Sequence, residues 1–279
     1  MPTYSLMRHE QVKKLVNRQI YSLNRHLQSL QGGQGVSLNG SSLNPSELSR
    51  TYSMHKMGKK NPRAMRNYTI DPTISCAVSI VVDVSGSMSE NINFKKKPYE
   101  MTSYTECIYA LDSMTRAFDS LGIKSRVGLC ALQWDENKGK ATTGCRPIVY
   151  ELKGEKEKWK DQTTKDVIGM HPWTGTDLIS YAKASIDMVK SMKATHKIAF
   201  FMTDMADSGV RDKLLEMGAL AKAEGITLVG LGFMQVNPRD KWYSYHEASY
   251  SNSLPNCICG ANAEEICEKL IPELIKILK

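Results

Sequence analysis

The sequence has no long hydrophobic run. No stretch of its 279 residues approaches the roughly 18–20 continuous apolar residues that a membrane-spanning helix needs. The N-terminal stretch MPTYSLMRHEQVKK also lacks the apolar core of a signal peptide. The seven cysteines are an odd number, and Cys76, Cys107 and Cys130 lie among apolar residues, as buried thiols do. We therefore expect a protein without disulfides in a reducing, cytoplasmic compartment.

Several motifs of enzymes and metal sites are also missing. The G-x-S-x-G elbow of serine hydrolases is absent, because Val84 precedes Ser85. Aspartyl-phosphate enzymes that resemble the haloacid dehalogenase family have a second acid where this chain has Ser85. The phosphate-binding pattern G-x-x-x-x-G-K-[ST] does not occur. Cys257, Cys259 and Cys267 lack the C-x-x-C spacing of zinc sites, which favours buried thiols.

Positive charge is concentrated in the first quarter of the chain. Residues 1–70 carry eleven Lys and Arg against two acidic residues, or +9, whereas the remainder carries 26 against 27, or −1. The pI of about 9.0 therefore describes this extension and not the rest of the chain. Such an extension suits nucleic acid or an acidic protein as a partner, although a merely solvated arm is the commoner case.

The patterns within the extension differ from those that follow it. Residues 8–30 have apolar side chains at three- and four-residue spacing, which predicts an amphipathic helix. The stretch Gln31–Asn44 is rich in Gly, Ser and Asn, and is typical of a flexible linker or a hairpin. We therefore divide the chain into a basic, helical N-terminal extension, residues 1–70, and a domain, residues 71–279.

Strand and helix patterns alternate within the predicted domain. Four continuously apolar stretches predict strands of a parallel sheet covered on both faces, at residues 75–82, 126–133, 197–203 and 226–233. Helical patterns cover residues 98–121, 177–193, 208–224 and 261–278. This alternation predicts an α/β fold with a doubly wound, mostly parallel central sheet flanked by helices.

Oxygen-bearing side chains follow these strands. Asp83, Ser85 and Ser87 come after the first strand in VVDVSGSMSE, Thr176 precedes a helix in WTGTDL, and Asp204 ends the third strand. Because ligands of such sheets bind beyond the carboxyl ends of the strands, we expect these side chains at one edge. Two acids and three hydroxyls form an all-oxygen donor set that suits Mg²⁺ or Mn²⁺. The alternative is that Ser85 and Ser87 cap the segment that follows them.

Taken together, D-x-S-G-S, the distant G-T-D and the T-D after a strand resemble the metal-ion-dependent adhesion site of von Willebrand factor type A (VWA) domains. The resemblance spans roughly residues 74–279 in the order of elements. It implies a protein-binding domain without catalytic activity, which holds one Mg²⁺ or Mn²⁺ and leaves a position open for a Glu or Asp of a partner. The implied ligands are Asp83, Ser85, Ser87, Thr176 and Asp204.

The chain departs from the family pattern at three places. Met205 stands where the third loop usually has glycine, and Thr174 stands where the second loop often has glycine. The long interval between Ser87 and Thr176 predicts an insertion within residues 134–170. Beside the implied ligands, we expect Met88, Trp173 and Met205 to contact the partner.

Three kinds of partner remain open from the sequence. The basic segment that leads into V-V-D-V-S-G-S-M resembles the intracellular VWA proteins related to the large accessory subunit of cobaltochelatase, which work with AAA+ ATPases. The chain lacks the long acidic tract of chelatase subunits, so the resemblance implies only metal-dependent docking. The second alternative is an RNA-binding VWA protein, resembling the Ro autoantigen, that uses residues 1–70. The third is a virion or structural interaction protein.

Overall fold

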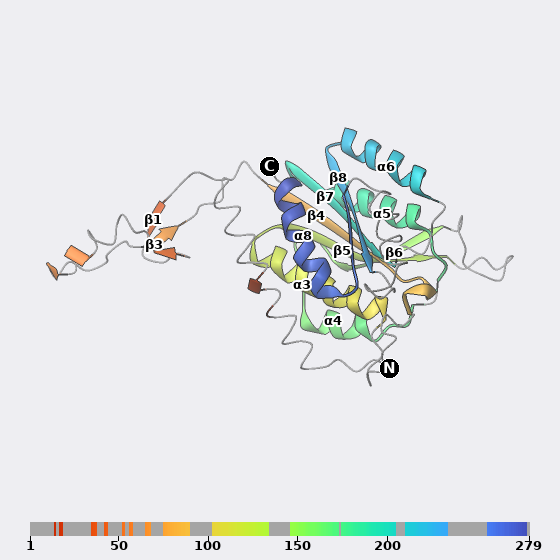
Figure 1. Ribbon diagram of the computed structural model, residues 1–279, viewed down its shortest axis with the longest axis horizontal. Helices are drawn as coiled ribbons and strands as arrows, with labels where there is room; N and C mark the ends of the chain where they lie inside the picture. The colour runs from red at the N-terminus through yellow and green to blue at the C-terminus, as the bar shows by residue number, and fades with distance from the viewer. Residues whose placement is uncertain are drawn as a thin grey trace, which may run out of the picture.

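A computed structural model describes residues 75–89, 102–133, 146–172, 174–204, 210–233 and 256–277, together with short pieces between residues 14 and 67. The sheet has six strands in the order β6-β5-β4-β7-β8-β9 (Figure 1). Strand β6 is antiparallel to β5, and the other neighbours are parallel. The strands are β4 (Cys76–Asp83), β5 (Lys124–Leu132), β6 (Pro147–Lys153), β7 (His196–Thr203), β8 (Ile226–Phe233) and β9 (Cys257–Gly260).

Helices cover both faces of this sheet (Figure 1). Helices α3 (Ser103–Ser120), α4 (Asp161–Ile168) and α8 (Ala263–Ile277) pack on one face, and α5 (Leu178–Lys190) and α6 (Arg211–Ala223) pack on the other. Along β4, Val78 and Ile80 belong to the first core, whereas Ala77 and Val81 belong to the second. Both faces of the strand are thus buried, which is why its sequence is continuously apolar.

The predicted fold class is confirmed. The four predicted strands correspond to β4, β5, β7 and β8, and the four predicted helices correspond to α3, α5, α6 and α8. Within the described part of residues 71–279, two strands and a helix were not predicted. Strand β9 has only four residues, and β6 and α4 fall within residues 134–170, where the sequence indicated an insertion.

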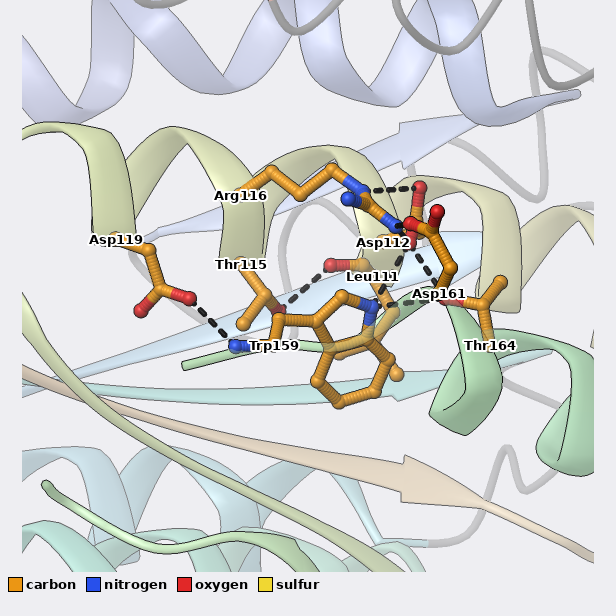
Figure 2. A network of polar contacts seen from close by, with 8 residues as sticks. All are labelled: Leu111, Asp112, Thr115, Arg116, Asp119, Trp159, Asp161 and Thr164. Atoms are coloured by element: carbon orange, nitrogen blue, oxygen red, sulfur yellow. Dashed lines mark hydrogen bonds and ion pairs between the residues drawn. The ribbon is translucent and has the colours of Figure 1, made fainter. Parts of the chain in front are cut away.

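A network of hydrogen bonds and ion pairs joins helix α4 and the residue Trp159 before it to α3 (Figure 2). The indole Nε1 of Trp159 donates to Asp112 Oδ1 and to Thr164 Oγ1, at 2.8 Å in each case. The Arg116 Nε donates to both oxygens of Asp112, at 3.0 and 2.9 Å, and its Nη2 donates to Asp161. Near the end of α4, Tyr104 Oη donates to the Val167 carbonyl at 2.9 Å. These contacts fix the start of the loop that leads to Thr176.

The cysteines within the described ranges are free thiols, as predicted. Cys259 and Cys267 are buried and Cys257 is half-buried. The Sγ atoms of Cys257 and Cys259 lie 3.8 Å apart on the same strand, which is too far for a disulfide bond. None of the helices in this part of the chain has the length and apolar character needed to span a bilayer.

Short pieces of the N-terminal extension are also described. Strands β1 (Gly35–Ser37), β2 (Ser42–Leu43) and β3 (Met65–Asn67) form an antiparallel sheet in the order β1-β3-β2. Strands β1 and β2 both pair with β3, so the stretch Gln31–Asn44 is not a simple hairpin. Lys14, Asn17 and Arg18 are helical and exposed, and the rest of the predicted helix 8–30 lies outside the described residues.

Candidate metal site

Two carboxylates meet at the edge of the sheet. Asp83 is the last residue of β4, and Asp204 follows the last residue of β7. These two strands are parallel neighbours, with Val82 opposite Met202, so their carboxyl ends lie side by side. Asp83 is fully buried and Asp204 is 6% exposed. The structure therefore brings together the two acids that the sequence placed at one edge.

The three hydroxyls of the predicted donor set lie in a row beside these acids. Ser85 and Ser87 follow β4, and Ser87 lies in the short 3-10 helix η1 (Gly86–Ser89). Ser85 Oγ is 3.1 Å from Ser87 Oγ, and Ser87 Oγ is 3.5 Å from Thr176 Oγ1. Ser85 Oγ thus contacts another hydroxyl of the set, which favours the ligand interpretation over helix capping.

Thr174, which sequence reasoning did not select, joins the two hydroxyl-bearing loops. Its backbone amide donates to the Val84 carbonyl at 3.2 Å, and its carbonyl accepts from the Gly86 amide at 2.8 Å. Together these bonds form an isolated parallel bridge between Thr174 and Ser85. No local sequence pattern reveals this role, because its partners lie about ninety positions earlier in the chain.

The buried carboxylates carry an electrostatic cost. Burial, and then the negative charge of Asp204, raise the pKa of Asp83 to about 7. Hydrogen bonds work against this rise: the Ser85 amide donates to Asp83 Oδ1 at 2.6 Å and the Thr203 hydroxyl donates to Asp83 Oδ2 at 2.8 Å. A divalent cation near both acids would remove the repulsion between them. The donor set therefore fits Mg²⁺ or Mn²⁺ in its chemistry.

This site is poor in acidic ligands. The described residues contain no cluster of three or more His, Cys, Asp and Glu side chains of the kind that holds a metal. The candidate set has two carboxylates and three hydroxyls, which are five side chains for an ion that prefers six ligands. An octahedral ion held by these five side chains would keep one position for water or for a ligand from outside the chain.

Helix α5 positions the loop that bears Thr176. Asp177 caps this helix, since its Oδ1 accepts from the Ser180 amide at 3.2 Å. Tyr181 Oη donates to the Gly175 carbonyl at 2.8 Å, and Tyr181 is fully buried. Burial, and then the negative charge of Asp83, raise the pKa of the Tyr181 phenol, so it stays protonated and able to donate. Thr176 is thus held between two fixed neighbours.

Of the three residues predicted to contact a partner, the structure describes only Met88. Met88 is fully buried, because the turn of η1 directs it into the core against α3, and this removes it as a partner-binding residue. Trp173 and Met205 lie outside the described residues.

Comparisons with known proteins return only structural likenesses, since no family model and no curated protein matches the chain. The PilB minor pilin from Streptococcus sanguinis has 16% identity over 78% of this chain and 65% of that chain, with a TM-score of 0.48. The conserved hypothetical protein BatB from Bacteroides thetaiotaomicron has 12% identity over 73% and 98%, with a TM-score of 0.46. The SpRpn10 VWA domain has 9% identity over 72% and 95%, with a TM-score of 0.41.

These neighbours include a VWA domain, and at such identities the likeness concerns the fold alone. The chain spans 65% of the length of the PilB minor pilin.

Proposed function

We propose that this chain is a metal-dependent protein-interaction module of the VWA type, which docks an acidic residue of a partner protein. The observation that carries the proposal is the convergence of Asp83 and Asp204 with the hydroxyls of Ser85, Ser87 and Thr176 at one edge of the sheet. No catalytic activity belongs to the proposal.

The residues have distinct roles in it. Ser85, Ser87 and Thr176 ligate Mg²⁺ or Mn²⁺ through their hydroxyls, and Asp83 and Asp204 ligate it directly or through water. The bound cation supplies a position that a Glu or Asp of another protein can fill. The gain from filling it comes from charge attraction in a partly dehydrated setting.

Calorimetry tests the metal site. The wild type should bind one Mg²⁺ or Mn²⁺, and the double variant Ser85→Ala/Ser87→Ala should lose that binding. Ser180→Ala is the matched control, because its hydroxyl donates to Asp177 and lies outside the ligand set. Unchanged affinity in the double variant would refute the site assignment.

The proposed partner is an AAA+ ATPase, on the resemblance to the intracellular branch related to the cobaltochelatase accessory subunit. The free thiols of the described residues support a reducing, cytoplasmic compartment. Capture of a purified AAA+ ATPase should require Mg²⁺, fail in EDTA, and weaken at least ~10-fold, or about 1.4 kcal/mol, in Asp83→Ala. Equal capture under all these conditions would contradict docking through the metal.

A second candidate function is RNA binding by the extension. The observation that favours it is the charge of +9 on residues 1–70. Binding through that charge should weaken steeply with salt. A mobility shift with generic RNA that disappears when residues 1–70 are removed would support this function, and it would leave the metal site untouched.

A further inference from the structure

Two buried hydroxyls outside the donor set contact the candidate site from within the fold. Thr203, the last residue of β7, and Tyr181, in the first turns of α5, are both fully buried. Each carries a single hydroxyl proton, so each can donate to only one acceptor at a time. What each donates to therefore determines what it holds in place.

Thr203 lies between the two carboxylates. Its Oγ1 is 2.8 Å from Asp83 Oδ2 and 3.5 Å from Asp204 Oδ1, so the proton goes to Asp83. The other oxygen of Asp83 accepts from the Ser85 amide at 2.6 Å. With a donor on each oxygen, the Asp83 carboxylate cannot rotate without breaking a hydrogen bond to a charged group, which is among the stronger kinds in proteins. Thr203 thus fixes the direction in which Asp83 presents its remaining lone pairs.

Tyr181 acts on the other loop, and its hydroxyl also lies against Asp83. Burial, and then the charge and hydrogen bond of Asp83, raise the pKa of the Tyr181 phenol. Its hydroxyl donates to the Gly175 carbonyl at 2.8 Å, directly before Thr176. On the far side of Gly175, the backbone of Thr174 is bonded to Val84 and Gly86. The peptide that leads into Thr176 is therefore held by α5 on one side and by the first loop on the other.

We propose that Thr203 and Tyr181 are positioning residues of the metal site. Thr203 orients the Asp83 carboxylate, and Tyr181 fixes the position of the Gly175 peptide, which carries Thr176. This inference rests on the proposed metal-binding function. Neither residue needs to touch the cation. Their contribution is to hold ligands in the geometry that an octahedral ion demands before it arrives.

The two residues should differ in the size of their effect. Loss of the Thr203 hydroxyl frees a charged ligand, whereas loss of the Tyr181 hydroxyl loosens the peptide next to a neutral one. We expect Thr203→Val to weaken Mg²⁺ affinity about tenfold, or 1.4 kcal/mol. Tyr181→Phe should weaken it by a smaller factor, on the order of threefold. Thr203→Ser keeps the hydroxyl and should restore the affinity of the wild type.

The experiment measures Mg²⁺ and Mn²⁺ affinity by calorimetry and thermal unfolding in EDTA on the full chain. Ser79→Ala is the matched control. Ser79 is a fully buried serine on β4 whose hydroxyl donates to the Ser185 carbonyl, and it lies about 13 Å from Asp83 at the usual rise per strand residue. It should lower the unfolding temperature without changing the metal affinity. Should Thr203→Val fail to fold, Thr203→Ala supplies a smaller variant without the hydroxyl.

The outcomes separate this inference from the function on which it rests. A wild type that binds neither cation would overturn both. Binding that the Ser85→Ala/Ser87→Ala variant loses and the Thr203 variants keep would overturn the positioning role alone. A purely structural role is the conclusion if Thr203→Val and Thr203→Ser lower the unfolding temperature equally and leave the dissociation constant unchanged.

Discussion

At the scale of single residues, Asp83 is costly to ionise where it lies. It is fully buried, and its pKa is raised from 3.8 to about 7 by burial first and by Asp204 second. A rise of that size corresponds to a destabilisation on the order of 4 kcal/mol once the group is charged. A carboxylate buried at such a cost is a candidate for a binding role.

The stability of the metal-free protein should therefore fall as pH rises. Between the unfolded pKa of 3.8 and the folded pKa of about 7, the folded chain binds more protons at Asp83 than the unfolded chain does. The stabilisation is complete below pH 3.8 and is lost as pH rises through 7. Urea unfolding in EDTA at pH 5 and pH 8 measures it. Asp83→Asn should lack this loss and should be the more stable protein at pH 8. Parallel pH profiles for the two proteins would show that Asp83 is not the cause.

At the scale of elements, the network between α3 and α4 is the feature that holds the unpredicted segment in place. Asp112 is 2% exposed and accepts from Arg116, Trp159 and Thr164 (Figure 2). Three donors on one buried carboxylate leave it well satisfied, and its removal would leave the half-buried guanidinium of Arg116 with Asp161 as its acidic partner. The network is thus worth more than an exposed ion pair.

Replacement of Asp112 should destabilise the domain accordingly. Asp112→Ala removes an acceptor that three donors share, and we expect a loss of roughly 3 kcal/mol, since a hydrogen bond to a charged group contributes about 1.5–3 kcal/mol. Trp159→Phe removes only the indole donor and should cost about 1–3 kcal/mol. Glu273→Gln, which breaks the exposed pair with Lys276, is the control and should cost at most about 1 kcal/mol. Equal losses for Asp112→Ala and Glu273→Gln in urea unfolding would show that the network does not carry stability.

The position of each strand in the sheet explains whether the sequence predicts it. Strands β4, β5, β7 and β8 lie inside the sheet and are buried on both faces, so their continuously apolar sequences are recognisable. Strand β6 pairs on one side with β5 and exposes Val149 and Tyr150, so its pattern is that of a polar loop with scattered apolar residues. Its place was set by pairing with a distant strand and not by local preference.

Some residues of the candidate site could be predicted from the sequence, and others could not. Asp83 and Asp204 were predictable, because the carboxyl ends of adjacent parallel strands share an edge. Thr174, Thr203 and Tyr181 were not, because each acts through a partner whose proximity only the fold creates. Met88 was assigned wrongly, because a residue next to a ligand in the sequence can turn to the opposite side within one turn of a 3-10 helix.

At the scale of the whole molecule, the candidate metal site and the point where the extension joins the domain lie at opposite ends of β4. The site lies at the carboxyl end of β4, whereas the extension precedes Cys76 at the amino end of the same strand. The eight residues of β4 span roughly 23 Å at the usual rise per residue.

Removal of residues 1–70 should leave a folded domain. Among the described residues, an ion pair from Arg18 Nη1 to Glu268 Oε1 at 3.1 Å joins the extension to α8, and both side chains are more than half exposed. Such pairs contribute about 0–1 kcal/mol, so a chain that begins at residue 71 should unfold cooperatively with a loss of that order. It should also keep the Mg²⁺ affinity of the full chain. Arg18→Ala in the full chain is the control for the ion pair alone. Aggregation, or thermal unfolding without a cooperative transition, would show that the helix containing Arg18 is part of the core against α8.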